Sequence, residues 1–445
     1  MNIVIVGAGE VGTHLAKMLS DDNHDIVLLD DNEEKLKHIS SHVDVLTQKG
    51  GANSINDLKE AGVAKADLVI AVTPFEERNI VTCILSKDIG AKKTIARIDN
   101  SEYLQKNNKA KFERLGIDEL IYPESLAAKE IFTSLKQVGS RQLLEFSGGK
   151  LIMNAVKIRD NAPIVNKTLE EIGNIYSEFR AVAITRKNET IIPHGKDKIL
   201  PEDIVYFVTD RAGVDKVLDK SGKKKFAVKN VMILGGSRIG QKTALKLQEK
   251  DYNIKIVEID RERSIKVADL LVNSLIINAD GRNLAILKEE GIDQMDAFVA
   301  VTGNSETNIL SCQLAKRLGV RRTVAEVENL DYMNIAHEIG IGTLVNKKLI
   351  AASYIYRFTL QAEVSHMKCL SATDAEVLEF IAKPDALITK KAISDVSFPS
   401  EANIGGIIRN NRGYIVKGDT QIQEGDKVVV FALPSVVKKL EKYFK

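Results

Sequence analysis

Short apolar runs alternate along the first 140 residues with longer segments whose apolar residues recur every three or four positions. The short runs predict β-strands, and the longer segments predict amphipathic helices. Because the two kinds alternate, the pattern predicts a parallel, doubly wound sheet with helices on both faces. The strands are expected near residues 2–6, 25–29, 43–47, 67–72, 93–98 and 119–122, and the helices near 10–20, 32–41, 54–61, 76–89 and 101–108.

A longer helix is expected at about 124–138, and its apolar side is expected to carry Leu126, Ile131, Leu135 and Val138. Its counterpart in the second half of the chain is expected at about 348–364. The apolar face of such a helix can pack against a neighbouring subunit or repeat, or it can cover its own sheet. The pattern alone leaves both arrangements open.

The chain repeats itself at a nearly constant spacing, which is the mark of an internal duplication. The segment from Asn2 to Gly12 recurs from Asn230 to Gly240, and Leu58–Val63 recurs as Leu287–Ile292. A second, smaller unit follows each of these, because the segment ending in Asp203–Phe207 recurs as the one ending in Asp426–Val430. The order is therefore A-B-A-B. We expect an α/β fold with four domains at 1–139, 140–222, 223–368 and 369–445.

Composition narrows the class of protein. The 445 residues are 44% hydrophobic and 28% charged, as in a globular chain. The 63 basic and 61 acidic residues leave a net charge of +2, which gives no electrostatic reason to expect nucleic acid. No apolar run approaches the ~18 residues that cross a bilayer, and the N-terminus lacks the features of a signal peptide. We therefore expect a cytoplasmic protein that binds no nucleic acid.

A metal site or a disulfide framework is not expected. The three cysteines are few and widely scattered. His38 and His42 stand four residues apart on a predicted helix, but no third ligand accompanies them. They are interpreted as a surface pair.

The first glycine-rich segment, Gly7-Ala8-Gly9-Glu10-Val11-Gly12, follows a predicted strand and opens a predicted helix. In this setting Gly7 permits a tight turn, and Gly9 lets backbone N–H groups approach a pyrophosphate. Gly12 lets helix and strand pack closely. Asp30 ends the next strand, where its carboxylate can accept hydrogen bonds from ribose hydroxyls and would repel a 2′-phosphate. The segment therefore favours NAD over NADP.

The second segment, Gly235-Gly236-Ser237-Arg238-Ile239-Gly240, carries Ser237 where the middle glycine is expected. A Cβ at this position restricts the approach of a phosphate without abolishing it. Glu258 matches Asp30 and keeps the acceptor for the ribose. A nucleotide is therefore expected here too, and an empty or weakened site is the alternative.

The two segments differ in charge. The position of Glu10 in the first half is occupied by Arg238 in the second. The position of Arg97, at the end of the fifth strand, is occupied by Glu326. A cation beside the phosphate loop favours a more anionic ligand such as ATP or ADP. We therefore hypothesise that the two sites prefer different nucleotides. Solvated surface charges with no role in binding are the alternative.

Two threonines lie where a doubly wound sheet binds its ligands. Thr73 and Thr302 end the fourth strand of each repeat, at the carboxyl edge. Contact with a ribose or phosphate is one role for them, and capping the next helix is the other.

Catalytic machinery is not evident. A nicotinamide enzyme needs a proton donor or acceptor beside the substrate, but the seven histidines do not assemble one, and no Tyr-x-x-x-Lys motif is present. Nucleotide binding without reaction chemistry is typical of a sensor. We expect no enzyme activity. An NAD-dependent oxidoreductase is the first alternative, and a scaffold with vestigial loops is the second.

Taken together, these motifs resemble the regulators of potassium conductance, the RCK (or KTN) family, over essentially the whole chain. The features that carry the resemblance are the first glycine segment with Asp30, the second with Glu258, Asn79 and Asn308 after the fourth strands, and the strand openings Glu202-Asp203 and Gly425-Asp426. The chain departs from the family at Ser237 and at Gly50-Gly51, where a Gly-Asp pair is usual.

The resemblance implies two Rossmann-like RCK-N domains, each followed by a small α+β RCK-C domain. It also implies NAD(H) as ligand, with ATP or ADP at the second site, and a homo-oligomer, either a dimer or a tetrameric ring. The implied role is to gate a Trk-type membrane potassium transporter from the inner face of the cell membrane. The implied nucleotide contacts of the first site are Gly7, Ala8, Gly9, Glu10, Val11, Gly12, Asp30, Thr73, Pro74 and Arg97. Those of the second site are Gly235, Gly236, Ser237, Arg238, Ile239, Gly240, Glu258, Asp280 and Thr302.

Overall fold

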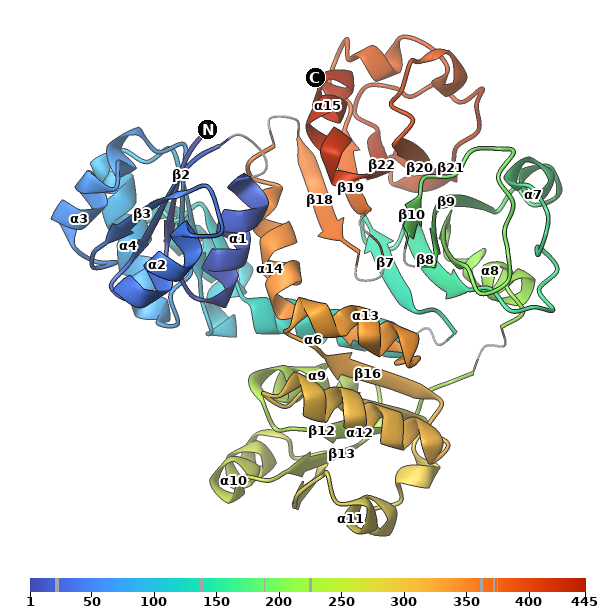
Figure 1. Cartoon of the computed structure of the whole chain (residues 1–445), viewed down its shortest axis with the longest axis horizontal. Coiled ribbons are helices and arrows are strands. Elements are labelled where there is room, and N and C mark those ends of the chain that lie inside the picture. Colours follow the sequence, from blue (N-terminus) through green and yellow to red (C-terminus); the bar gives the residue numbers. More distant parts are fainter. Residues whose placement is uncertain are drawn as a thin grey trace. The chain divides into compact units, whose positions relative to one another are not determined.

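The computed structural model describes residues 1–20, 24–136, 139–187, 189–223, 226–360, 363–370, 373 and 375–445. Within these ranges each half of the chain forms a parallel sheet followed by an antiparallel one (Figure 1). The chain divides into two compact units, Met1–Leu126 with Lys347–Thr359, and Ala127–Asn346 with Leu360–Lys445. The duplicated α/β architecture predicted from the sequence is confirmed.

The first parallel sheet has the strand order β3-β2-β1-β4-β5-β6, the order of a dinucleotide-binding fold. Helices cover both faces, so the central strands are apolar on both sides; Leu68 to Ala71 are all fully buried. The strands are β1 (Asn2–Val6), β2 (Asp25–Asp30), β3 (Leu46–Lys49), β4 (Leu68–Ala71), β5 (Lys93–Arg97) and β6 (Glu119–Ile121). The helices are α1 (Glu10–Ser20), α2 (Glu33–Ser40), α3 (Ile55–Glu60), α4 (Glu76–Ile89), α5 (Lys106–Arg114) and α6 (Pro123–Lys136).

Two predicted elements of this sheet are shifted. β3 begins at Leu46 rather than at residue 43, because its register with β2 pairs Val27 with Leu46. The helix expected at 101–108 is instead a 3₁₀ turn, Ser101–Leu104, followed by α5. The extended backbone of Gln105 separates them.

The second parallel sheet repeats the same order, β14-β13-β12-β15-β16-β17. Its strands are β12 (Asn230–Leu234), β13 (Asn253–Glu258), β14 (Leu275–Asn278), β15 (Ala297–Ala300), β16 (Arg322–Glu326) and β17 (Thr343–Val345). Its helices are α9 (Arg238–Gln248), α10 (Arg261–Leu270), α11 (Leu284–Glu289), α12 (Ser305–Arg317), α13 (Leu330–Glu338) and α14 (Lys347–Tyr356). None of the described helices is both long enough and apolar enough to cross a membrane.

The two antiparallel sheets also share one topology, β10-β9-β11-β8-β7 and β21-β20-β22-β19-β18. The first contains β7 (Gln142–Phe146), β8 (Leu151–Lys157), β9 (Phe179–Arg186), β10 (Glu189–Ile191) and β11 (Ile204–Thr209), with helices α7 (Leu169–Ile175) and α8 (Val214–Lys220). The second contains β18 (Val364–Cys369), β19 (Glu376–Ile381), β20 (Ala402–Arg409), β21 (Arg412–Ile415) and β22 (Lys427–Ala432), with helix α15 (Pro434–Phe444).

The antiparallel sheets pack on each other through one common hydrophobic core. Met153, Tyr206 and Val208 from the first sheet are buried with Val377 and Phe431 from the second. The facing sides of the two sheets are therefore buried against each other. Removing so much apolar surface from water joins the two into one stable body.

A buried ion pair recurs at the strand openings that the sequence singles out. Asp203 accepts two hydrogen bonds from the Arg186 guanidinium, at 2.9 and 2.8 Å, and one from the Leu200 N–H. Asp426 makes the same bidentate pair with Arg409. In each sheet the pair ties the start of one strand to the end of its neighbour.

The helices that follow the two parallel sheets are not equivalent in length. α6 ends at Lys136, and residue 138 of the expected helix lies outside the described residues. α14 ends at Tyr356, so the expectation of a helix to residue 364 is wrong. The chain leaves the helix because Val364 opens β18, which pairs with β19.

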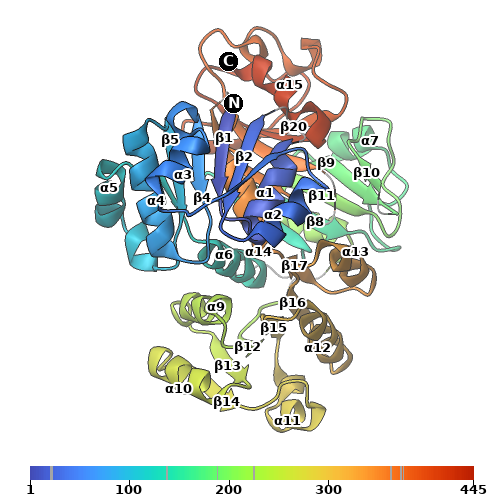
Figure 2. The same cartoon turned by 60° about the vertical axis from the view of Figure 1, so that its left-hand side comes forward.

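The packing of these helices settles an alternative that the sequence left open. α14 comes from the second half of the chain but packs against α1 in the first unit (Figures 1 and 2). Conversely, the buried guanidinium of Arg322 on β16 donates to the main-chain oxygens of Ser134, near the end of α6, and Ser140. Each helix therefore packs on the neighbouring repeat.

Candidate functional site

The first glycine segment forms a tight loop between β1 and α1. Gly7 has φ +111°, and a Cβ there would lie 2.9 Å from the Thr73 nitrogen. A Cβ on Gly12 would lie 1.9 Å from the Gly7 oxygen. A Cβ on Gly9, in contrast, would have no atom within 4 Å. The fold itself thus requires glycine at positions 7 and 12, whereas the open space at Gly9 is free for a ligand.

The carboxylate at the end of β2 holds this loop in shape. Asp30 Oδ2 accepts the Ala8 N–H at 2.6 Å, and Oδ1 accepts the Asn32 N–H at 2.9 Å. The second half repeats the arrangement. Glu258 accepts the Gly236 N–H at 2.7 Å and the Asp260 N–H at 2.8 Å. The predicted partners of both loops are therefore brought together.

The threonines at the ends of the fourth strands bind a buried asparagine. Asn79 Oδ1 accepts the Thr73 hydroxyl at 2.7 Å, and its amide donates to the Thr73 and Arg97 carbonyls. Asn308 makes the same bonds with Thr302 and Glu326. These amides tie the carboxyl ends of two neighbouring strands together. The sequence located both asparagines but gave them no role.

The threonines are not the helix caps. The N-cap residues of α4 and α12 are Phe75 and Asn304. Each threonine hydroxyl instead accepts the N–H of its cap residue at 3.3 Å. The turn after each fourth strand therefore holds the threonine hydroxyl oxygen beside the start of the following helix. Pro74, between Thr73 and Phe75, is exposed.

Two charged residues of the first half that the sequence singles out, Arg97 and Glu10, form ion pairs. Arg97 donates to Glu124 in the first turn of α6 at 3.0 Å. Glu10 pairs with Lys348 in the first turn of α14, with Nζ 3.2 Å from Oε1. The charges singled out in the sequence are thus paired with residues that the sequence did not suggest, because α6 and α14 reach these places only through tertiary packing. Val11 is buried in the core.

The second loop accommodates its serine. Gly235 has φ +105°, and a Cβ on Gly240 would lie 2.2 Å from the Gly235 oxygen, as in the first loop. The Ser237 hydroxyl caps α9 by accepting the Gly240 N–H at 3.3 Å, and it donates to the Val301 oxygen at 2.7 Å. Both bonds therefore fix the hydroxyl of Ser237 at the start of α9. Ile239 is buried behind it.

A cleft of about 400 Å³ opens beside the second loop. It brings together Gly235, Ser237, Glu258, Asp280 and Thr302, all of which the sequence predicts. The other predicted residues of this loop are not among those that line the cleft; they are Gly236, Arg238, Ile239 and Gly240. The carboxyl edge of the sheet thus holds a hollow of the size that small ligands occupy.

Two arginines in this cleft were not predicted. Arg282 donates to Asp280 at 2.7 Å, and this bond lowers the pKa of the Asp280 carboxyl and raises the pKa of Arg282. Arg263 lies 3.7 Å from Glu258. Arg282 follows Asp280 by two residues, so the loop sequence carried a signal for it. Arg263 lies one turn into α10, and no motif marks it.

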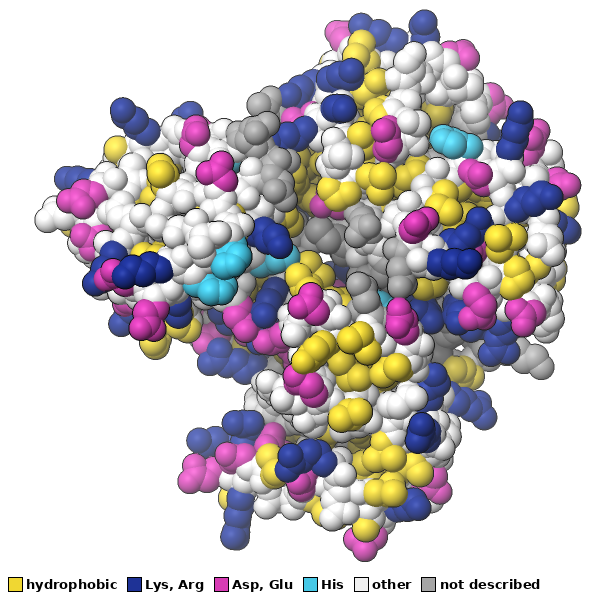
Figure 3. Space-filling view, viewed as in Figure 1, with side chains coloured by type: hydrophobic (Ala, Val, Ile, Leu, Met, Phe, Trp, Pro, Cys, Tyr) yellow, Lys and Arg dark blue, Asp and Glu magenta, His cyan; other side chains and the backbone are white. Residues whose placement is uncertain are grey.

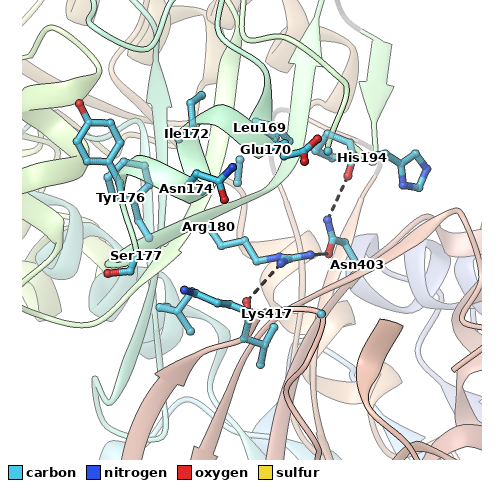
Figure 4. Close-up of a pocket in the computed structure, with 18 of the residues that line it drawn as sticks. Leu169, Glu170, Ile172, Asn174, Tyr176, Ser177, Arg180, His194, Asn403 and Lys417 are labelled. Carbon is cyan, nitrogen blue, oxygen red and sulfur yellow. Dashed lines mark hydrogen bonds between the residues drawn. The ribbon is translucent and has the colours of Figure 1, made fainter. Parts of the chain in front are cut away.

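A second cavity, of about 450 Å³, lies where the two antiparallel sheets meet (Figure 4). Arg180 on β9 spans the joint and donates to Asn403 Oδ1 at 3.2 Å and to the Val416 oxygen at 3.3 Å. Burial lowers the pKa of Arg180. His194 and Lys417, which occupy matching repeat positions, line the same cavity. The joint between the two antiparallel sheets therefore carries different side chains at equivalent positions of its two sides, and so different charges.

Comparison with known proteins places these features in a family. The model of the TrkA-N domain matches residues 3–123 and 231–347, and that of the TrkA-C domain matches residues 154–222 and 377–445. The chain belongs to the TrkA family. Relatives include a Trk system potassium uptake protein TrkA homolog 1 of Methanosarcina mazei, 33% identical with both chains covered completely. The TrkA of Halomonas elongata is 29% identical over all of this chain and 98% of that one.

Solved structures share the fold of this TrkA-family chain. The GsuK RCK domain matches with a TM-score of 0.63 at 15% identity, over 100% of this chain and 94% of that one. A GsuK channel bound to NAD matches with a TM-score of 0.63 at 15% identity, over 99% and 78% of the two chains. The four-sheet order is therefore the RCK fold.

The described part of this TrkA-family chain shows little reactive chemistry near the loops. Cys83 on α4 and Cys312 on α12 are buried at matching positions, and burial raises the pKa of Cys312 to about 12. The described residues contain no cluster of acidic, histidine or cysteine side chains that could hold a metal ion. The His38 ring on α2 stacks on the ring of His42, which follows the end of this helix; the ring centroids are 5.0 Å apart and both residues are exposed.

Proposed function

We propose that this chain is a regulatory subunit that binds NAD(H), with ATP or ADP at its second site, and gates a Trk-type membrane potassium transporter. The repeated loop geometry carries the proposal. In both halves a strand-end carboxylate accepts the N–H of the residue after the first glycine, in Ala8–Asp30 and in Gly236–Glu258. Such a loop presents the N-terminus of a helix to a pyrophosphate.

The comparisons support the ligand and the partner. Relatives at about 30% identity are Trk potassium uptake proteins, and the GsuK fold neighbours were solved with NAD and with ADP. At the second site, Arg263 and Arg282 bring guanidinium groups to the cleft, which suits a terminal phosphate. Glu258, which is almost fully buried, disfavours a 2′-phosphate.

We further propose that binding occurs without catalysis. Among its described lining residues, the second cleft contains no histidine, cysteine, tyrosine or lysine to move a proton, and its carboxylates are held by backbone N–H groups at Glu258 and by Arg282 at Asp280. A ligand would then act by favouring one arrangement of the subunits over another, and a tenfold difference in affinity shifts that equilibrium by ~1.4 kcal/mol. The transporter partner places the subunit in the cytoplasm, at the inner face of the cell membrane.

Recovery of the partner tests this function. The full chain is used as bait in detergent-solubilised membranes of its source cells, with NADH, with ATP and with neither. We expect a multi-pass potassium transporter, identified by mass spectrometry, in amounts that differ at least threefold between nucleotides. NADH absorbance is followed in parallel. Sustained oxidation together with no transporter would favour the oxidoreductase instead.

An exposed apolar face supports the proposed homo-oligomer. Hydrophobic side chains gather over α12 and over α13 of the second parallel sheet (Figure 3). The most prominent are Leu310, with 68% of its surface exposed, and Ile335, with 53%. An apolar patch of this kind on a globular protein usually marks an interface.

Charge on this face should therefore dissociate the oligomer. For Leu310→Asp we expect the mass measured by light scattering to fall at least twofold toward the 49.1 kDa of one chain. A buried aspartate at an interface would lack compensation for its lost hydration. Leu46→Asp, at an exposed leucine of the first parallel sheet, serves as the control. An unchanged mass for the Leu310 variant would place the interface elsewhere.

A further inference from the structure

Lys348 lies beside the first loop, although it belongs to the second half of the chain. It stands in the first turn of α14, the helix that packs on α1 (Figures 1 and 2). Its ammonium is 3.2 Å from the carboxylate of Glu10, and the lysine side chain is only 18% exposed. Glu10 is the first residue of α1 and directly follows Gly9. The cation therefore lies at the end of the helix that a phosphate would approach.

Within the described part of the chain, Glu10 forms its ion pair with Lys348 and with no second cation. His14 follows Glu10 by one helical turn. Burial lowers the pKa of His14, and the charges of Lys348 and then Lys17 lower it further. The imidazole is therefore neutral at pH 7, and Lys348 supplies the positive charge over this turn. Lys17 is exposed one turn farther along α1.

The corresponding position in the other repeat carries the opposite charge. Lys348 aligns with Glu124, which pairs with Arg97 inside the first unit. Arg97, which the family resemblance implies as a nucleotide contact of the first site, is thus already engaged by a buried carboxylate. Among the described residues, the ion-pair partner of Lys348 is Glu10, whose side chain is more than half exposed. Of the two cations, Lys348 is the easier to transfer to a ligand.

We propose that Lys348 is a phosphate-specificity residue of the first nucleotide site, contributed by the opposite repeat; this rests on the proposed function. The bridging pyrophosphate of NAD(H) lies between two nucleosides and has no terminal phosphate. ADP and ATP carry a terminal phosphate with additional charge, which can take the ammonium from Glu10 as a charge-assisted hydrogen bond. Lys348 thereby adds affinity for ADP and ATP, so that they can compete with NAD(H) at this site, and links their binding to α14.

The absence of tryptophan from the chain makes a site-specific measurement possible. Phe75→Trp places a single indole two residues after Thr73, at an exposed position. Its fluorescence is quenched by energy transfer when NADH binds at the first loop, and ATP is measured by displacement of NADH. Asn304→Trp reports the second cleft in the same way. Both probes are used in the full chain.

In the Phe75→Trp background we expect Lys348→Gln to lower the affinity for ATP about tenfold and to change the affinity for NADH less than twofold. Lys17→Gln removes a charge from the same helix and should change neither affinity. Glu10→Gln releases the ammonium and should strengthen ATP. Melting curves without ligand confirm that each variant is folded.

Two results would overturn the assignment. Equal ATP affinity in the Lys348→Gln and Lys17→Gln variants would exclude contact with the phosphate. An equal loss of affinity for ATP and for NADH in the Lys348→Gln variant would mean that Lys348 only positions α14. If NADH quenches neither probe in the otherwise original chain, the proposed function itself fails, and this inference fails with it.

Discussion

Replacing Gly9 with aspartate is expected to weaken NADH binding at the first site about 100-fold while leaving the unliganded chain at least as stable. Affinity should fall while stability does not, because a side chain at position 9 would face open space. A Cβ there meets no atom within 4 Å, and the Gly9 carbonyl accepts the first bond of α1 from Thr13. Aspartate is a preferred residue at such an N-cap. Its charge would nevertheless repel a pyrophosphate, and a 100-fold loss corresponds to ~2.7 kcal/mol.

The measurement is quenching of the Phe75→Trp probe by NADH, with calorimetry of the unliganded chain. Gly9→Ser is the matched control because Ser237 occupies the equivalent position in the second loop without disturbing it. It should cost far less affinity than aspartate. Gly12→Ala should instead unfold the loop, since its Cβ would lie 1.9 Å from the Gly7 oxygen. Undiminished NADH affinity in the aspartate variant would exclude this loop as the pyrophosphate site.

Removal of either strand-opening aspartate is expected to destabilise the paired antiparallel sheets by about 3 kcal/mol. In Asp203→Ala the Arg186 guanidinium and the Leu200 N–H lose a carboxylate that is almost completely buried. Asp426→Ala has the same effect on Arg409. Because the two sheets share one core, both substitutions should lower the same thermal transition.

Differential scanning calorimetry of the full chain measures this effect. Asp219→Ala removes an exposed carboxylate from α8 of the same sheet and should leave the transition within about 1 °C of its original temperature. Two separate transitions, each sensitive to only one of the aspartates, would show that the sheets unfold independently.

Most of the fold could be predicted from the sequence because its signals are local. The alternation of apolar runs predicted both parallel sheets, and the repeated loops predicted that the second would follow the first. The sterics of Gly7 and Gly12 agree with their predicted roles. The shifted start of β3 and the turn before α5 were missed because they depend on register and on single side-chain caps. Such features have weak sequence signals.

The charge partners of the loops could not be predicted for a different reason. Glu124 and Lys348 lie far from the loops in sequence, and their helices carry no binding motif. Only the packing of α14 on α1 brings Lys348 to Glu10. The hypothesis that the two sites prefer different nucleotides therefore considered the charge of Glu10 without the cation beside it. The different nucleotide preferences of the two sites stay a prediction.

The common core of the antiparallel sheets also bears on how this chain could have evolved. In a homodimer, every substitution at the joint is made twice, on both sides of the symmetry axis. Here the two sides are encoded separately, so each has been free to change alone. Arg180 has Asn403 as its counterpart, and the helix α7 has only the short turn Ile393–Asp395. Covalent fusion thus permits a division of labour between the halves that a symmetric pair of single-repeat subunits could not acquire.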